Sequence, residues 1–180
     1  MDTNTPFSVA HAHVCHWEGY FDDDPDDAGG VTKYGVCLEF LKSIGADGDI
    51  NGDGVVNRKD VLAVTLDNQK ELFKKHFWDS ANLDDFPPRL AICFYDSAVN
   101  TGKKQTVKLL QRALGVSDDG IIGPKTMAAV KSCDDKATAL KMCDFRDKFY
   151  QSISTKNNNR KFLKGWLNRV EACRKLIKSY

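Results

Sequence analysis

Apolar residues recur at helical spacing through most of the chain, beginning close to its N-terminus. A first helix is predicted from Thr5, which can cap it, to Glu18, which Gly19 follows. Pro6 suits the first helical position. The apolar residues of this stretch fall on one face of a helix: Phe7, Ala10, Val14 and Trp17.

The second half of the chain carries the same period more strongly. Predicted helices cover residues 68–78, 87–100, 104–114, 124–133, 136–154 and 160–178. The apolar run Leu90–Phe94 predicts a helix that is buried on most sides. Residues 31–40 fit either a strand or a second helix, and residues 45–57 form a loop rich in Gly and Asp. We therefore expect a mainly α protein with an irregular lobe at 1–86 and a helical lobe at 87–180.

Charge is distributed unevenly along the 180 residues. The formal net charge of +1 combines −8 in residues 1–60, −2 in residues 61–100 and +11 in residues 101–180. This division suggests cation or acid chemistry in the first part and an anionic polymer bound by the last. Lysines and arginines that line solvated helix faces would explain the basic part equally well.

Several classes of protein are disfavoured by the composition. No apolar run approaches the ~20 residues of a membrane-spanning helix, so no membrane insertion is expected. The first residues lack the features of a signal peptide, which predicts synthesis in the cytoplasm and export by another route. The six cysteines include no CxxC pair, and we expect most of them to be buried, reduced thiols.

The strongest local motif is a twelve-residue loop, Asp49–Asp60. Its sixth position is Gly54, where a calcium loop turns sharply. Five side chains with oxygen atoms stand at positions 1, 3, 5, 9 and 12, and the carbonyl of Val55 is added at position 7: Asp49, Asn51, Asp53, Asn57 and Asp60. This order predicts an EF-hand-like Ca²⁺ site. Asp60 in place of the usual Glu resembles the dockerin variant. A surface turn without metal is the alternative.

A second motif places one acid at a helix end and a carboxylate-rich loop after it. Glu18 beside Trp17 is followed by acids at 22–24, 26 and 27, then by Gly29, Gly30 and Thr32. Glycoside hydrolysis needs one protonated carboxylic acid and a second group that activates water or stabilises the cation. Burial against Trp17 and the negative end of a helix would both favour the protonated form of Glu18. From the residues alone, an Asp-rich loop that is merely solvated explains the motif as well.

Residues 18–32 resemble the signature of glycoside hydrolase family 108, the phage-type N-acetylmuramidases. The positions that agree with it are Glu18, Gly19, Asp24, Pro25, Asp27, Gly29, Gly30 and Thr32, whereas Tyr20, Phe21 and Asp23 depart from it. Further similar segments follow in the family's order at 76–79, 94–102, 110–126 and 165–170, the third of which resembles a peptidoglycan-binding region. The calcium loop stands where the family usually has a shorter linker.

The resemblance implies an α+β lysozyme-like fold and hydrolysis of the β-1,4 bond after N-acetylmuramic acid in bacterial peptidoglycan. Glu18 would then be the general acid, and Asp27 or Thr32 would position the attacking water. Tyr34, Asp96 and Asn100 would contact the substrate, although Asp96 and Asn100 fit a structural polar network equally well. A monomer that binds peptidoglycan and no nucleic acid is expected. It would remain in the host cytoplasm until lysis and then act on the cell wall, and a secreted toxin is the alternative.

Two other groups of residues are weaker candidates for a functional site. His11, His13 and His16 with Cys15 lack the downstream pair that a tetrahedral zinc site needs. A Cys–His nucleophile is supported only by the presence of both residue types. The rival from a different class is a calcium-stabilised peptidoglycan-binding protein without hydrolase activity. Glu18 favours the enzyme, because a decayed site would be expected to lose its acid first.

Overall fold

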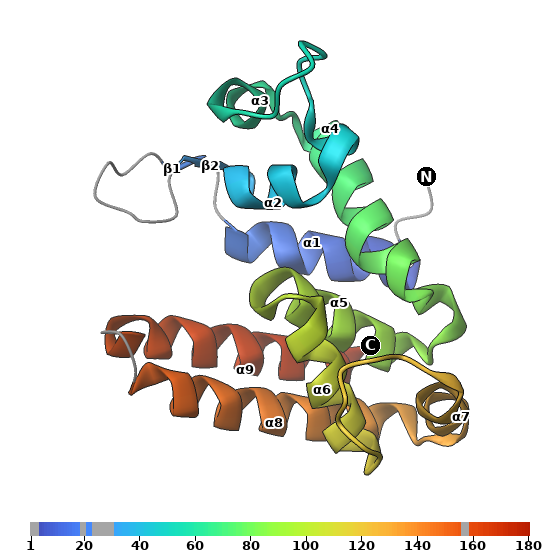
Figure 1. The fold of residues 1–180 in the computed structure, drawn as a ribbon. Coiled ribbons are helices and arrows are strands. Elements are labelled where there is room, and N and C mark those ends of the chain that lie inside the picture. The colour runs from blue at the N-terminus through green and yellow to red at the C-terminus, as the bar shows by residue number, and fades with distance from the viewer. Residues whose placement is uncertain (1–3, 19–20, 23–30, 156–158) are drawn as a thin grey trace. The chain divides into compact units, whose positions relative to one another are not determined.

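The protein is mainly α-helical, as expected. The computed structural model describes residues 4–18, 21–22, 31–155 and 159–180 (Figure 1). The helices and strands are α1 (Pro6–Glu18), β1 (Phe21–Asp22), β2 (Thr32–Lys33), β3 (Val36–Cys37), α2 (Leu38–Ser43), α3 (Arg58–Ala63), α4 (Leu66–Phe73), α5 (Pro88–Thr101), α6 (Lys103–Leu114), α7 (Pro124–Ser132), α8 (Asp135–Ser154) and α9 (Leu163–Ser179). Short helical turns are η1 (Gly45–Gly48), η2 (Lys74–Trp78), η3 (Asp79–Ala81), η4 (Leu83–Asp85) and η5 (Asn159–Phe162).

The chain divides into two compact units that do not follow its linear order. One unit combines residues 1–13 with residues 77–180, and the other consists of residues 14–76. The sequence predicts lobes at 1–86 and 87–180. In the structure, residues 1–13 and 77–86 belong instead to the same unit as residues 87–180. Because the boundary lies inside α1, its first residues contribute to one core and its last residues to the other.

In the unit of residues 14–76, a hairpin precedes the first short helix. The three strands form an antiparallel sheet in the order β1-β2-β3, with Thr32 opposite Cys37 and Lys33 opposite Val36. The Cys37 sulfur then accepts the Phe40 amide at 3.5 Å and caps α2. Residues 31–40 thus contain both a strand pair and the start of a helix, which is why their pattern fits neither element alone.

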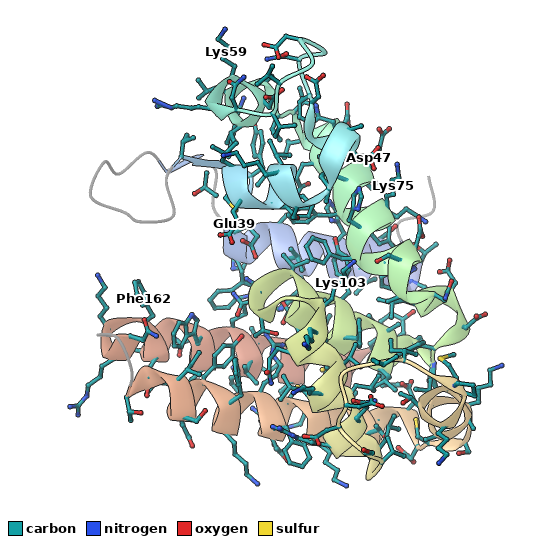
Figure 2. All side chains as sticks on the ribbon, viewed as in Figure 1. Glu39, Asp47, Lys59, Lys75, Lys103 and Phe162 are labelled. Carbon is teal, nitrogen blue, oxygen red and sulfur yellow. The ribbon has the colours of Figure 1, made fainter. Side chains whose placement is uncertain are left out.

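The same unit is held together by polar contacts between its turns. The Asp47 carboxylate in η1 lies 2.6 Å from the Lys75 ammonium and 2.9 Å from the His76 Nε2 atom, both in η2 (Figure 2). These contacts hold the pKa of Asp47 below its usual range, with the Lys75 hydrogen bond as the largest cause. Under this cluster, Phe40 and Phe73 pack edge to face with ring centroids 5.7 Å apart.

The first part of α1 belongs to the larger unit because of an aromatic cluster. The Phe7 ring lies 5.4 Å from that of Trp78 and 5.7 Å from that of Tyr95. One turn later, His11 Nδ1 is 3.0 Å from the Tyr95 hydroxyl. The predicted cap is present, since the Thr5 hydroxyl accepts the Ser8 amide at 3.1 Å.

The rest of the larger unit is a helical bundle in which α8 and α9 lie side by side (Figure 1). The buried helix α5 packs against α6, α8 and α9. Its N-terminus is capped from another helix, because the Asp135 carboxylate accepts the amides of Arg89 at 3.2 Å and Leu90 at 2.8 Å. None of the helices in the described part of the chain combines the length and apolar character that crossing a membrane requires.

One buried carboxylate connects three helices of this bundle. Asp96 of α5 is fully buried, and its oxygens lie 2.6 Å from Arg146 Nη1 of α8 and 2.8 Å from Arg169 Nε of α9. Burial alone would raise the pKa of Asp96, but Arg146 and then Arg169 hold it far below its usual range. The carboxylate therefore remains charged in the fold and ties α5 to both neighbours.

We predict that Asp96→Asn destabilises the protein strongly, because it removes the buried negative charge that the guanidinium groups of Arg146 and Arg169 contact. The expected loss is about 3–5 kcal/mol in the free energy of unfolding, measured by chemical denaturation at neutral pH. Since the folded pKa of Asp96 is depressed, its contribution is present above the unfolded pKa and disappears as the pH falls through the folded value. The loss caused by Asp96→Asn should therefore shrink at acid pH.

The matched control is Asp118→Asn, which removes an exposed carboxylate 2.6 Å from the Arg112 Nε atom. An exposed pair contributes little, so its curve should overlay the wild type. An Asp96→Asn variant as stable as this control would contradict the structural role of Asp96.

Candidate functional site

Glu18 is the last residue of α1 and is half-buried. The end of the helix is fixed by Val14, one turn earlier, which is fully buried. An acid at this position lies at the negative end of the helix dipole, which disfavours a negative charge. The helix end predicted at Glu18 is confirmed, and the surroundings of its side chain come from a hairpin turn.

That turn consists of Tyr34 and Gly35, between β2 and β3. Both residues have positive φ angles, 53° for Tyr34 and 77° for Gly35. A tight turn with two positive φ values matches the right-handed twist of the strands it joins. The Tyr34 carbonyl accepts the side-chain amide of Gln69 at 3.3 Å, and the same nitrogen lies 3.9 Å from the Cys15 sulfur. Gln69 thus fastens the turn to α1, three residues before Glu18.

Gly35 lies directly against the Glu18 side chain. A Cβ atom built on Gly35 would stand 2.7 Å from both Cβ and Cγ of Glu18 and 2.9 Å from its Oε2. Such distances are far shorter than van der Waals contact, and the Cβ of Glu18 cannot move without its helix. Only glycine leaves room for the acid here, and it also tolerates the positive φ. The backbone of the turn therefore forms one wall of the site.

Of the two residues predicted to position the attacking water, the structure describes Thr32 but not Asp27. Thr32 is half-buried at the start of β2, in the hairpin that also carries Tyr34. Tyr34 is half-buried, and the Lys33 ammonium lies 5.7 Å from the centre of its ring. Asp27 and the rest of the acid-rich loop, residues 23–30, lie outside the described residues.

The two predicted substrate contacts in α5 serve the core of their own unit. Asp96 is completely buried between Arg146 and Arg169, as described above. Asn100 is half-buried, and its side-chain oxygen accepts a hydrogen bond from the Tyr150 hydroxyl. From the sequence, Asp96 and Asn100 could either contact the substrate or form a structural polar network. The contacts observed here form a structural network.

The loop Asp49–Asp60 folds around its own side chains. The Asp49 carboxylate accepts three backbone amides at 2.8–3.1 Å, from Gly52, Asp53 and Gly54. Gly54, at the sixth position, has φ +83°. Asp60 accepts the amides of Asn51 and Asn57 at 3.1 and 2.7 Å. The chain thus turns where a calcium loop must turn, and each carboxylate retains lone pairs for an ion.

The exit from the loop also follows the calcium-binding pattern. Asn57 caps α3, where its side-chain oxygen accepts the Lys59 amide at 2.8 Å. Burial would raise the pKa of Asp60, but backbone amides, that of Asn57 first, hold it below its usual value. Among the described residues, the groups of three His, Cys, Asp or Glu side chains whose ligand atoms lie within 4.8 Å of one another do not include side chains of this loop. The donor set fits a hard cation, which would have to draw the side chains inward.

A separate pocket lies in the larger unit, at residues 111–126. Its volume is about 630 Å³, and the exposed Ile121 is among its lining residues. The pocket is organised by the buried Gln111, whose side-chain nitrogen donates to Asp119 at 2.7 Å and to the Ile121 carbonyl at 3.0 Å. Gln111 also accepts the Gly120 amide at 2.8 Å. One side chain thus holds an exposed loop in a fixed shape.

The acid Glu18 thus lies at a helix end, against a tight turn, in a mainly α, lysozyme-like fold. Residues 11–102 match the family model described as glycosyl hydrolase 108, and residues 105–171 match that of a predicted peptidoglycan domain. The first match spans half of the chain, and the chain belongs to the glycosyl hydrolase 108 family. It is therefore an enzyme, an N-acetylmuramidase that hydrolyses peptidoglycan.

A solved structure shares the fold of this chain. The structure of Brucella abortus SagA is 30% identical in sequence and superimposes with a TM-score of 0.80. The match covers 97% of this chain and 94% of that one, so the two proteins share one fold over nearly their whole length. Among curated proteins, none matches this sequence significantly.

Proposed function

We propose that Glu18 is the general acid that protonates the leaving oxygen when the β-1,4 bond after N-acetylmuramic acid is cleaved. The observation that carries this proposal is the close approach of Gly35 to the Glu18 side chain. A backbone wall fixes the direction in which the carboxyl points, and a proton donor must lie within hydrogen-bond reach of the oxygen that it protonates. Half-burial at a helix C-terminus favours the protonated acid that this role requires.

Asp27 or Thr32 would position the attacking water on the other side of the sugar. Of the two, Thr32 stands in the hairpin whose turn contacts Glu18, which brings it into the same small structure. Most retaining glycosidases use a second carboxylate as the covalent nucleophile, whereas a water held by Thr32 would attack the sugar directly and invert the anomeric centre. Tyr34 is proposed as a substrate contact, because its ring belongs to the same turn.

We also propose that the loop Asp49–Asp60 binds one Ca²⁺. Asp49, Asn51, Asp53 and Asp60 would supply side-chain oxygens, Val55 its carbonyl, and Asn57 would complete the set. When bound, the ion would neutralise carboxylates that otherwise repel one another. No residue of the loop resembles an acid for bond cleavage, so the ion has a stabilising function.

The peptidoglycan domain gives the enzyme a second contact with its substrate. The pocket beside Gln111, with the exposed Ile121, is proposed as the place where this domain meets the polymer. The charge of +11 over residues 101–180 would add long-range attraction to anionic cell-wall material.

The first prediction tests the acid. Glu18→Gln keeps the size of the side chain but cannot donate the proton, so activity should fall by about 10²–10⁴-fold, the range for general acid catalysis. The assay is the clearing of purified peptidoglycan, and the melting temperature should stay close to that of the wild type. Glu39→Gln is the control, since Glu39 is an exposed acid in the same unit (Figure 2). Activity in Glu18→Gln above a few per cent would rule Glu18 out.

The second prediction tests the wall behind the acid. Gly35→Ala should displace the Glu18 carboxyl and lower kcat by about 10²-fold, the cost of a misplacement near 1 Å. Alanine at a positive φ also costs about 1–2 kcal/mol of stability.

Gly45→Ala separates these two effects, because Gly45 has φ +63° but no heavy atom within 4 Å of a built Cβ. Gly45→Ala should lose only the stability that the positive φ costs, and Gly35→Ala should lose more because its Cβ contacts Glu18. Only Gly35→Ala should lose kcat when both are assayed well below their melting temperatures. Equal kcat values in the two variants would show that the contact does not position the acid.

The third prediction concerns calcium. An ion that binds only the folded state adds about 2.7 kcal/mol when its concentration is 100 times its Kd. EGTA should therefore lower the melting temperature of calcium-loaded protein by several degrees, and Asp49→Ala with Asp53→Ala should abolish that response. A charge-matched double variant outside the loop, Glu39→Ala with Asp67→Ala, should keep it. An unchanged melting curve with and without EGTA would refute the calcium site.

A further inference from the structure

Three cysteines that are far apart in the sequence meet in the core of the larger unit. Cys93 of α5, Cys143 of α8 and Cys173 of α9 are all fully buried. Their sulfur atoms lie within 4.8 Å of one another, and those of Cys93 and Cys143 are 3.7 Å apart. Each thiol comes from a different helix, so the cluster forms only when the bundle is assembled.

These distances fit a shared metal ion. A metal–thiolate bond of about 2.3 Å places two sulfurs about 3.8 Å apart in a tetrahedral site and about 4.0 Å apart in a trigonal one. The 3.7 Å between Cys93 and Cys143 is within a few tenths of an ångström of both values. Small side-chain rotations would therefore suffice to bring all three sulfurs onto one ion.

A positive charge lies beside the cluster. Cys143 and Arg146 are three residues apart on α8, so the thiol shares a helix face with a guanidinium group. Arg146 is fully buried, and a positive charge at that depth favours the anionic form of a nearby sulfur.

Hydrogen bonds join the three sulfur atoms. The pKa of Cys143 lies well below its ordinary value because its sulfur is hydrogen-bonded to Cys173 and then to Cys93, with a further contribution from the Arg146 guanidinium. The pKa values of Cys93 and Cys173 are raised, first by their hydrogen bonds to Cys143. The three thiols therefore interact directly with one another in the core.

The number of available ligands limits which metal ions could bind the three sulfurs. Among the described His, Cys, Asp and Glu side chains, none joins all three sulfurs within 4.8 Å; His13 approaches only Cys173 and Asp96. Structural zinc sites are almost always four-coordinate, and catalytic zinc keeps a position open to water. A fully buried set of three thiolates suits instead a soft ion that accepts three ligands, for which Cu(I) is the standard case.

We propose that Cys93, Cys143 and Cys173 form a three-coordinate site for a soft, monovalent ion of the Cu(I) type that cross-links α5, α8 and α9. On binding, the ion enters and each sulfur coordinates it as a thiolate, so every proton that the coordinating thiols carried leaves to solvent and the loaded cluster has a charge of −2. No electron is transferred. The proposal is independent of the glycosidase mechanism.

The experiment uses the full chain, reduced and free of oxygen, titrated with Cu(I) that is buffered by a Cu(I)-selective chelator. One ion per chain should bind, with a thiolate-to-metal charge-transfer band in the near ultraviolet, a raised melting temperature and release of about two to three protons per ion. Cys143→Ser should weaken binding by more than about 100-fold, since even an outer-shell partner costs roughly 10–100-fold. Cys133→Ser is the matched control, because Cys133 is a half-buried cysteine of the same unit outside the cluster.

Loss of a ligand can also unfold the core, so a second measurement uses the wild type alone. In moderate urea, bound Cu(I) should slow the alkylation of Cys93, Cys143 and Cys173 but not that of Cys15, Cys37 or Cys133, as read by peptide mass spectrometry. Any of four results would overturn the proposal: no bound copper, equal loss in Cys133→Ser, preferential retention of Zn(II), or a disulfide within the cluster in place of the ion.

Discussion

The buried carboxylate of Asp96 is the interaction on which the larger unit depends. A charged group at this depth is unfavourable by itself, and it is tolerated because α8 and α9 each place one guanidinium against it, at 2.6 and 2.8 Å. The geometry of these contacts fixes how far α8 and α9 can slide along α5. The neighbouring Tyr150 then orders Asn100 at the end of α5, and its ring stacks on Trp166 at 5.1 Å. One ionic contact thus determines the register of three helices.

The catalytic proposal depends on a different constraint, the lack of a side chain at Gly35. A proton donor is useful only if its direction is fixed, and a long flexible carboxyl such as Glu18 is not fixed by its helix alone. The turn Tyr34–Gly35 supplies the fixed surface, and Gln69 holds the turn to α1 through the Tyr34 carbonyl. The position of the acid therefore depends on the backbone of this turn and on the neutral side-chain amide of Gln69. Neither group has a role in the proposed reaction.

The sequence predicted the elements whose signals are local. The helices from residue 87 onward appear close to their expected bounds, because Pro88 and the long apolar faces mark them directly. Residues 31–40 could not be assigned, since two-residue strands are too short to show alternation before α2 begins. The role of Asp96 could not be settled either, because a carboxylate for substrate and a carboxylate for the core look alike until burial is known. The meeting of Cys93, Cys143 and Cys173 depends on tertiary packing, and their spacing of 30 residues or more carries no signal.

The proposed calcium loop and the proposed acid belong to the same compact unit, and a chain of contacts connects them. Asp60, the last position of the loop, lies in α3, and the Leu62 carbonyl of that helix accepts the Lys33 ammonium at 2.7 Å. Lys33 directly precedes the turn that contacts Glu18. An ion that orders the loop would therefore steady α3, then the hairpin, then the wall behind the acid. A path of contacts does not by itself demonstrate coupling. A purely stabilising ion would leave kcat unchanged while the protein is folded, whereas a coupled ion would change kcat through the position of Gly35. Stabilisation and coupling can be distinguished well below the melting temperature, where the enzyme stays folded with or without the ion. Under those conditions, calcium can change kcat only by shifting the hairpin against Glu18.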